Sequence, residues 1–191
     1  SSNAGNNDDT GAPAIKAGTA FSLTATTGAG YDGTPELNAA PGLVVGSPTA
    51  GTLAGSFGAA AAGVATGNAF TYSEVGNFGL NSNAIFDDGF TGVDQSADCT
   101  NDFSTTLVGG MYGCMIGSVA VVQTTGSSGF GRFVPDHFAV TSPNLTPACS
   151  GMTYMGQAFT FEATIEARNS ADALTVNYEN DYAVATVSVV A

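Results

Sequence analysis

The sequence predicts an all-β protein: an immunoglobulin-like β-sandwich followed by the start of a second β-unit. Apolar and polar residues alternate with a period of two in several short segments, which is typical of strands with one buried face. Paired glycines and Asp-Gly steps separate these segments and predict tight turns. No long segment has a helical period. Short strands joined by glycine-rich turns are typical of a sandwich.

The alternation is clearest at residues 21–26 (FSLTAT), 78–80 (FGL) and 159–164 (FTFEAT). We expect each of these segments to form a half-buried strand. Two other runs are more continuously apolar, residues 115–122 (MIGSVAVV) and 184–190 (VATVSVV). They fit strands that are buried on both faces or that lie at an interface.

The one plausible helix is the alanine run at residues 59–62. Gly58 and Gly63 flank this run, and glycine disfavours a helix because it loses the most backbone freedom on folding. We therefore expect a loop or a single turn at this position.

A weak internal repeat divides the chain. Residues 18–26 (GTAFSLTAT) match residues 156–164 (GQAFTFEAT) at a constant offset of 138. Residues 12–131 are then expected to form an immunoglobulin-like unit, and residues 132–191 the start of a second one. Residues 1–11 are set apart as a tag remnant and a polar N-terminus that we expect to be disordered.

The second unit is short. A seven-stranded sandwich needs about 100 residues, and residues 132–191 supply only about 60 of them. An incomplete sandwich exposes apolar faces and strand edges. We therefore expect this unit to pack on the first, to exchange strands with another chain, or to complete one larger domain.

The charge excludes two classes of partner. The net charge is −13, from 16 acids against Lys16, Arg132 and Arg168. Binding to phosphate backbones needs clustered cations, so nucleic acid is excluded, and so is an anionic membrane surface. No run of about 18 apolar residues exists to predict a membrane span.

The lone histidine lies in the segment GRFVPDHF, residues 131–138, next to an aspartate. A histidine oriented by a carboxylate is the arrangement of a general base. Neighbours on a strand point to opposite faces, so we expect the side chains of Asp136 and His137 not to meet. No G-x-S-x-G turn supplies a nucleophile. We expect no catalytic residue here, and a joint between two pieces of structure instead.

The three cysteines are Cys99, Cys114 and Cys149. None has C-x-x-C spacing, and one histidine leaves too few ligands for a zinc site. Cys99 and Cys114 bracket a glycine-rich hairpin or loop, and a disulfide between them would contribute about 3 kcal/mol by the chain-entropy estimate. The alternative bridge is Cys114–Cys149. If Cys149 is left over, it pairs outside this sequence or with another molecule, or it is a free buried thiol.

An acidic cluster is the remaining candidate site. Five aspartates lie within residues 87–102, in a region without periodic pattern: Asp87, Asp88, Asp94, Asp98 and Asp102. Oxygen ligands from a loop are what Ca²⁺ uses, although the spacing is not that of an EF-hand. The alternative is that these aspartates are solvated and keep a lysine-poor protein soluble.

Four short segments resemble, in order and spacing, a run of the MshQ-like proteins. They are RFVPDHF (132–138), AC (148–149), YMGQAF (154–159) and TVNY (175–178). MshQ-like proteins are surface proteins associated with the mannose-sensitive haemagglutinin (MSHA) type IV pilus of Gram-negative bacteria. The resemblance is strongest over residues 131–182. It implies tandem β-domains in an exported structural or adhesive protein, and it offers no catalytic residues.

These observations predict a structural module of a bacterial surface protein, located at the cell surface, outside the cell or in the periplasm. A disulfide fits those compartments. The expected partners are proteins of a pilus or cell-surface assembly, or a second copy of the chain through strand exchange, with no cofactor. The alternative is an adhesin domain that binds carbohydrate or a receptor, with Ca²⁺ at the aspartates. An enzyme, chiefly a hydrolase, is the third reading.

Overall fold

The computed structural model describes residues 15–38, 51–92, 98–120, 130–179 and 183. This part of the chain is all-β, with a single 3₁₀ turn and no α-helix. The elements are β1 (Ile15–Lys16), β2 (Phe21–Thr26), β3 (Glu36–Leu37), β4 (Leu53–Ala54), β5 (Val64–Tyr72), β6 (Gly76–Phe78), β7 (Ile85–Asp87), η1 (Gly89–Gly92), β8 (Ile116–Gly117), β9 (Phe130–Val134), β10 (His137–Thr146) and β11 (Thr160–Arg168).

Two three-stranded sheets pack face to face as a β-sandwich. One has the order β2-β5-β4 and the other the order β1-β9-β6. Aromatic rings from both sheets meet in the core. The ring centroids of Phe21 on β2 and Phe133 on β9 are 5.3 Å apart, and those of Tyr72 on β5 and Phe78 on β6 are 4.7 Å apart. The sandwich-like all-β fold predicted from the alternation is therefore confirmed.

The strand at residues 21–26 forms as its pattern predicts. Phe21 and Leu23 are buried in the core, whereas Ser22 and Thr24 face partly outward. Its partner β5 runs antiparallel, and the register shifts by one residue between the pairs Phe21↔Phe70 and Leu23↔Gly67. Such a bulge re-aims the side chains along the strand, so that both Ala65 and Phe70 reach the core.

The alanine run at residues 59–62 is a turn, as expected. Ala61 and Val64 exchange backbone hydrogen bonds around it, and Ala62 and Gly63 both have positive φ angles, 50° and 79°. Two successive residues in the left-handed region end any helix, and they match the geometry of a tight hairpin turn.

A smaller third sheet, β3-β7-β8, lies at one end of the molecule. The apolar run at residues 115–122 contributes only the two residues of β8 to it, and Ile116 and Val119 are exposed, the latter at 82%. Burial on both faces is therefore wrong for the described part of this run, because β8 is an edge strand at the periphery. Residues 121–122 and the second run, 184–190, lie outside the described residues.

Strand β9 joins the sandwich to the C-terminal part of the chain. It pairs in parallel with β1 and antiparallel with β6, so the expected boundary between residues 131 and 132 falls inside this strand. A bend at Pro135 and Asp136 follows, and the chain then enters β10. The segment GRFVPDHF thus combines the last strand of the sandwich with a joint.

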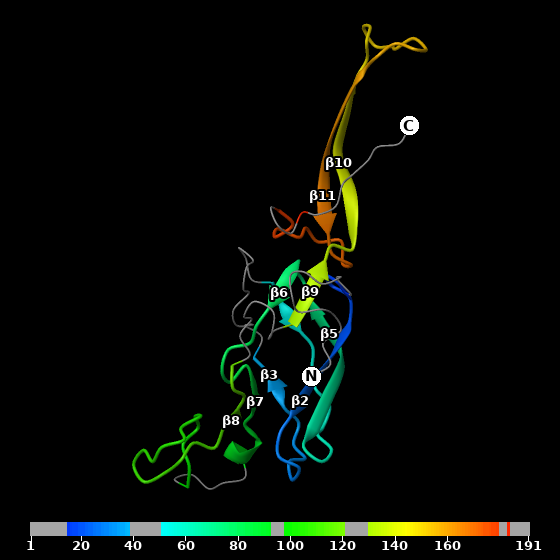
Figure 1. Cartoon of the computed structure of the whole chain (residues 1–191). Coiled ribbons are helices and arrows are strands. Elements are labelled where there is room, and N and C mark those ends of the chain that lie inside the picture. The colour runs from blue at the N-terminus through cyan, green and yellow to red at the C-terminus, as the bar shows by residue number, and fades with distance from the viewer. Residues whose placement is uncertain (1–14, 39–50, 93–97, 121–129, 180–182, 184–191) are drawn as a thin grey trace.

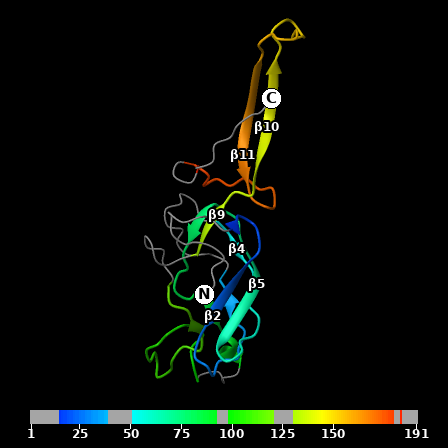
Figure 2. The same ribbon diagram turned by 45° about the vertical axis from the view of Figure 1, so that its right-hand side comes forward.

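Beyond the joint, β10 and β11 form a long antiparallel hairpin. Both views of the molecule show this hairpin projecting away from the sandwich (Figures 1 and 2). In the described part of the chain no helix is long and apolar enough to cross a membrane.

Candidate functional site

The hairpin base is fastened to the sandwich by a buried carboxylate. Glu74 follows β5 and is only 7% exposed. Its two oxygens accept hydrogen bonds from the backbone N–H groups of Val176 and Asn177, at 3.0 and 3.1 Å. Hydrogen bonds to a charged acceptor are stronger than neutral ones. We call the contacts of residues 73–75 with residues 169–177 the junction.

Two asparagines complete the junction. The side-chain amide of Asn177, which is fully buried, donates to the carbonyl of Val75 at 3.4 Å. Asn169 donates to the carbonyl of Ser73 at 3.1 Å. Its own oxygen accepts the N–H groups of Ala171 and Ala173, at 3.0 Å each. These bonds satisfy buried polar groups that would otherwise be costly, and they fix the loop after β11 against the sandwich.

The lone histidine lies on the outer side of this base, in an exposed ion-pair network. His137 Nδ1 is 3.0 Å from Asp136 Oδ2, and His137 Nε2 is 3.2 Å from Asp172 Oδ1. The expectation that Asp136 and His137 do not meet is wrong. Asp136 lies in the bend before β10, so strand alternation does not apply to this pair.

The same network ties both parts of the chain together. Lys16, at the end of β1, donates to the carbonyl of Asp136 at 2.9 Å and lies 3.2 Å from its carboxylate. On the other side, Arg168 donates to Glu166 at 2.6 Å and to the carbonyl of Asp172 at 2.7 Å. The network therefore links the first strand of the sandwich, the joint and the end of β11.

The pKa values of the network respond to these neighbours. The hydrogen bond to Asp136, followed by that to Asp172, raises the pKa of His137 above its ordinary 6.5. The hydrogen bond from His137 lowers the pKa of both aspartates below 3.8, assisted by Lys16 at Asp136 and by Arg168 at Asp172. Both imidazole nitrogens have carboxylate partners, which favours the imidazolium. The arrangement suits an ion pair that orients a joint.

The projecting hairpin has one apolar and one polar face. The pairs Phe138↔Ala167, Val140↔Ile165 and Leu145↔Phe161 place apolar side chains on the same face. The alternate pairs, among them Thr141↔Thr164 and Asn144↔Glu162, are polar. Apart from Ala167, the apolar side chains of these pairs are exposed. We call them the hairpin face.

The tip of the hairpin carries the third cysteine. Cys149 is exposed and unbridged, and its sulfur lies 3.7 Å from the amide nitrogen of Gln157. The expectation of a buried thiol is therefore wrong, because the tip lies far from either sandwich sheet (Figure 1). Large side chains at the tip are exposed as well, namely Met152, Tyr154 and Met155.

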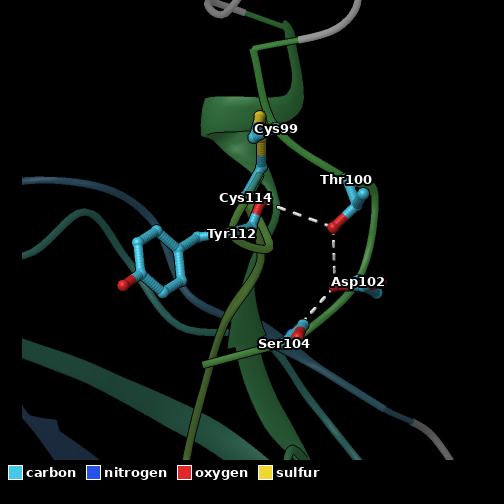
Figure 3. Close-up of a disulfide and its surroundings, with 6 residues drawn as sticks. All are labelled: Cys99, Thr100, Asp102, Ser104, Tyr112 and Cys114. Atoms are coloured by element: carbon cyan, nitrogen blue, oxygen red, sulfur yellow. Dashed lines mark hydrogen bonds between the residues drawn. A yellow bond between two sulfur atoms is a disulfide. The ribbon is translucent and has the colours of Figure 1, made fainter. Parts of the chain in front are cut away.

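The predicted disulfide Cys99–Cys114 is present, with Cα atoms 5.6 Å apart, and the alternative Cys114–Cys149 is wrong. Figure 3 shows how the loop folds around it. Asp102 Oδ1 accepts hydrogen bonds from the Thr100 hydroxyl at 3.0 Å and from the Ser104 N–H at 2.8 Å. Cys114 N–H donates to the Thr100 carbonyl at 2.8 Å, so backbone bonds and the bridge hold the same turn.

The aspartates are not gathered into one site in the described part of the chain. Asp87 accepts hydrogen bonds from the Tyr31 hydroxyl and from the Gly89 N–H. Burial and this contact with Asp87 raise the pKa of Tyr31 well above its usual value. Asp102 accepts hydrogen bonds within the disulfide loop. In the sequence Asp88 is next to Asp87 and Asp98 is next to Cys99, and Asp94 lies outside the described residues. No group of three or more potential metal ligands occurs among the residues described.

The junction was missed by sequence reasoning. Asn177 stood in TVNY at residues 175–178, a segment noted only for its resemblance to the MshQ-like proteins, and Glu74 was not singled out. A single acid inside an otherwise uncharged strand end was the available signal. Its partner Asn177, 103 positions further along the chain, has no feature in the sequence that marks it as a partner of Glu74.

One comparison with known proteins gives a match. Residues 115–191, less than half of the chain, match the family model described as DUF6701, third domain. Neither the curated proteins nor the solved structures contain a protein that matches this chain. The chain is therefore similar over its C-terminal part to a domain that covers β8, β9, the hairpin and the residues after it.

Proposed function

We propose that this chain is a structural module of an exported bacterial surface protein of the MshQ-like type, associated with biogenesis or adhesion of an MSHA-type pilus. The observation that carries the proposal is the junction: a buried Glu74 holds the base of a long hairpin on a sandwich. A hairpin held in a fixed direction is not required for the sandwich to fold. It is required of a module that presents neighbouring domains or sets the spacing between them.

Two further observations support this proposal. The residues that resemble MshQ-like proteins, 131–182, fall inside the part that matches the family model, 115–191. The disulfide is compatible with the periplasm or the cell exterior, where such bridges persist. The partners of the module are proteins of the pilus or cell-surface assembly.

The test of this role uses two measurements. The first is co-sedimentation of the purified chain with sheared MSHA-type pili, with reduced and alkylated chain as the control for the disulfide. The second is thermal unfolding with Ca²⁺ and with a glycan panel. A structural module co-sediments and shows no shift in Tm with either ligand class. No co-sedimentation, together with a ligand-induced rise in Tm, contradicts the proposal.

The hairpin tip favours a second candidate, an adhesin domain that binds a receptor or carbohydrate. Tyr154 and Met155 are exposed at the far end of the projection, and exposed aromatic and methionine side chains are common at binding surfaces. On this alternative a glycan or receptor ligand raises Tm by several degrees, and the double substitution Tyr154→Ser, Met155→Ser abolishes that rise without lowering the Tm of the free chain.

A further inference from the structure

The hairpin face is a large apolar surface in the part of the chain that the structure describes. Its five side chains are between 39% and 59% exposed: Phe138, Val140, Leu145, Phe161 and Ile165. If each side chain has an area of about 150–250 Å², the five together leave roughly 450 Å² of apolar surface bare. A contiguous apolar patch of several hundred Å² on a folded protein is often an interaction site.

The hairpin face carries no charge, although the chain is strongly acidic. Only two of the 16 acids, Glu162 and Glu166, lie within the hairpin, residues 137–168. Both belong to pairs of the polar face, Asn144↔Glu162 and Ala139↔Glu166. Charged residues are depleted at the centres of protein interfaces. The hairpin face therefore has the composition of an interface centre.

The internal repeat indicates what kind of surface covers such a strand. Its two copies begin with glycines of the same left-handed conformation, Gly18 and Gly156, with φ angles of 81° and 80°. The first copy then continues into β2 and the second into β11. The two strands thus have matching sequences and matching entry turns, and they differ in what packs on them.

In the first copy, the apolar side of β2 packs on the sheet that contains β9. The ring centroids of Phe21 and Phe133 are 5.3 Å apart, and Leu23 is only 2% exposed. Its counterpart in the second copy, Phe161, is 49% exposed. The first copy therefore indicates that the surface suited to the hairpin face is the apolar face of another sheet.

We propose that the hairpin face of one chain packs on the hairpin face of a second copy, with the two hairpins antiparallel about a two-fold axis. Two hairpins that pack face to face about 10 Å apart form a small sandwich of four strands. Each copy contributes the same surface, as in most symmetric dimers. This packing exchanges no strands, and it does not depend on the proposed association with a pilus.

The buried area is sufficient for such a dimer. Two copies bury roughly 1,000 Å² in total when the surrounding backbone and Ala163, which is also exposed, are included, and specific interfaces begin at about 1,000–1,200 Å². A two-stranded hairpin is marginally stable in water by itself, so the second copy supplies the layer that each hairpin needs. The strands of the sheet β3-β7-β8 are only two or three residues long, and the hairpin thus presents the longest exposed apolar face among the described sheets.

The distribution of charge favours antiparallel over parallel hairpins. Ten of the 16 acids precede residue 131, against the single cation Lys16. Because the hairpin projects away from the sandwich (Figures 1 and 2), parallel hairpins would bring two acidic sandwiches together, and like charges repel. Antiparallel hairpins place the base of one copy over the tip of the other, and residues 147–158 at the tip carry no charge. In this arrangement Phe138 of one copy lies over Leu145 of the other.

The first test is sedimentation of the full chain at about 1 to 500 μM, a range that detects weak as well as strong interfaces. A Cys149→Ser background excludes dimers linked by that thiol, and a reversible equilibrium between monomer and dimer is expected. Ile165→Glu places a carboxylate in both faces and should raise the dissociation constant by about tenfold or more. Thr164→Glu adds the same charge on the polar face and should change it by less than about twofold. Both positions are exposed, so neither substitution is expected to unfold the chain.

The second test detects the direction of packing. In the same background, chains with Phe138→Cys are mixed with chains with Leu145→Cys, and mild oxidation is expected to join the two different chains, as judged by mass. A mixture of Ala139→Cys and Asn144→Cys chains is the matched control on the polar face and should not cross-link. A chain that is monomeric at every concentration overturns the proposal, because the face is then left for a different partner or for residues of the same chain. Equal effects of the two glutamate substitutions, no cross-link in the first mixture, or cross-links only between like chains also overturn it.

Discussion

The backbone N–H of Asn177 donates a hydrogen bond to Glu74 Oε2 at 3.1 Å, across 103 positions of sequence. Glu74 follows β5, the strand in the middle of one sandwich sheet, and Asn177 follows the hairpin. This contact therefore sets the direction in which the hairpin leaves the sandwich. It is buried at both ends. Closing a loop of this length costs conformational entropy. We therefore interpret the contact as one that fixes the geometry of the hairpin relative to the sandwich.

Substitution of Glu74 by Ala is expected to weaken the junction strongly. It removes the acceptors of the buried N–H of Asn177 and of the partly buried N–H of Val176, and a buried N–H left without a partner costs roughly 1–3 kcal/mol. We expect a loss of about 3 kcal/mol in the free energy of unfolding measured with urea. Glu162→Ala, on the exposed polar face of the hairpin, is the matched control and should change it by less than about 0.5 kcal/mol.

The histidine gives a pH-dependent readout of the joint. The carboxylate neighbours raise the pKa of His137 in the folded state, so protonated His137 stabilises the folded chain. This stabilisation is fully present below the unfolded pKa of about 6.5, and it is lost as pH rises through the folded pKa. The depressed pKa values of Asp136 and Asp172 act in the opposite sense. Their stabilisation is present above about 3.8 and is lost as pH falls through the folded values.

Nuclear magnetic resonance titration checks this directly, since the chain has one imidazole. The pKa of His137 is expected to lie above 6.5. Asp136→Asn should lower it more than Asp172→Asn does, because the contact with Asp136 is the larger cause of the shift. A larger effect from Asp172→Asn would show that the bend at Asp136 has a different geometry.

The disulfide prediction is tested with thiol counts and unfolding. The native chain should react with one equivalent of a thiol reagent, at Cys149, and with three equivalents after reduction. Cys99→Ala with Cys114→Ala should lose up to about 3 kcal/mol by the chain-entropy estimate for a loop of about 15 residues. Cys149→Ser is the control, and its stability should equal that of the parent. Three reactive thiols in the native chain would contradict the bridge.

Features that depend on local pattern were predictable from the sequence. The alternation at residues 21–26, the turn at residues 59–62 and the pairing of Cys99 with Cys114 each depend on residues close together in the chain. The apolar run at residues 115–122 misled for a physical reason. An apolar composition indicates that a strand could be buried on both faces. Whether it is buried depends on its position in the fold, and β8 lies at the edge of its sheet.

Features that depend on long-range geometry were not predictable. The contact of Asp136 with His137 requires a bend where strand alternation was assumed, and Pro135 alone did not reveal it. The junction joins two segments whose only shared property is a buried polar residue in each, Glu74 and Asn177. Nothing in one sequence states that such groups are partners, because hydrogen bonds satisfy polar groups without any pattern in spacing.

The two copies of the repeat provide a matched pair for the last prediction. Phe21 packs against Phe133 and Phe70 in the sandwich core, so Phe21→Ala should remove about 3–5 kcal/mol of stability through lost burial and a cavity. Its counterpart Phe159 is more than half exposed, and Phe159→Ala should cost less than about 1 kcal/mol. Both values come from urea unfolding of otherwise identical chains. A similar large loss at both positions would mean that Phe159 is covered in solution, and would show that the residues before β11 have a partner that the hairpin alone does not supply.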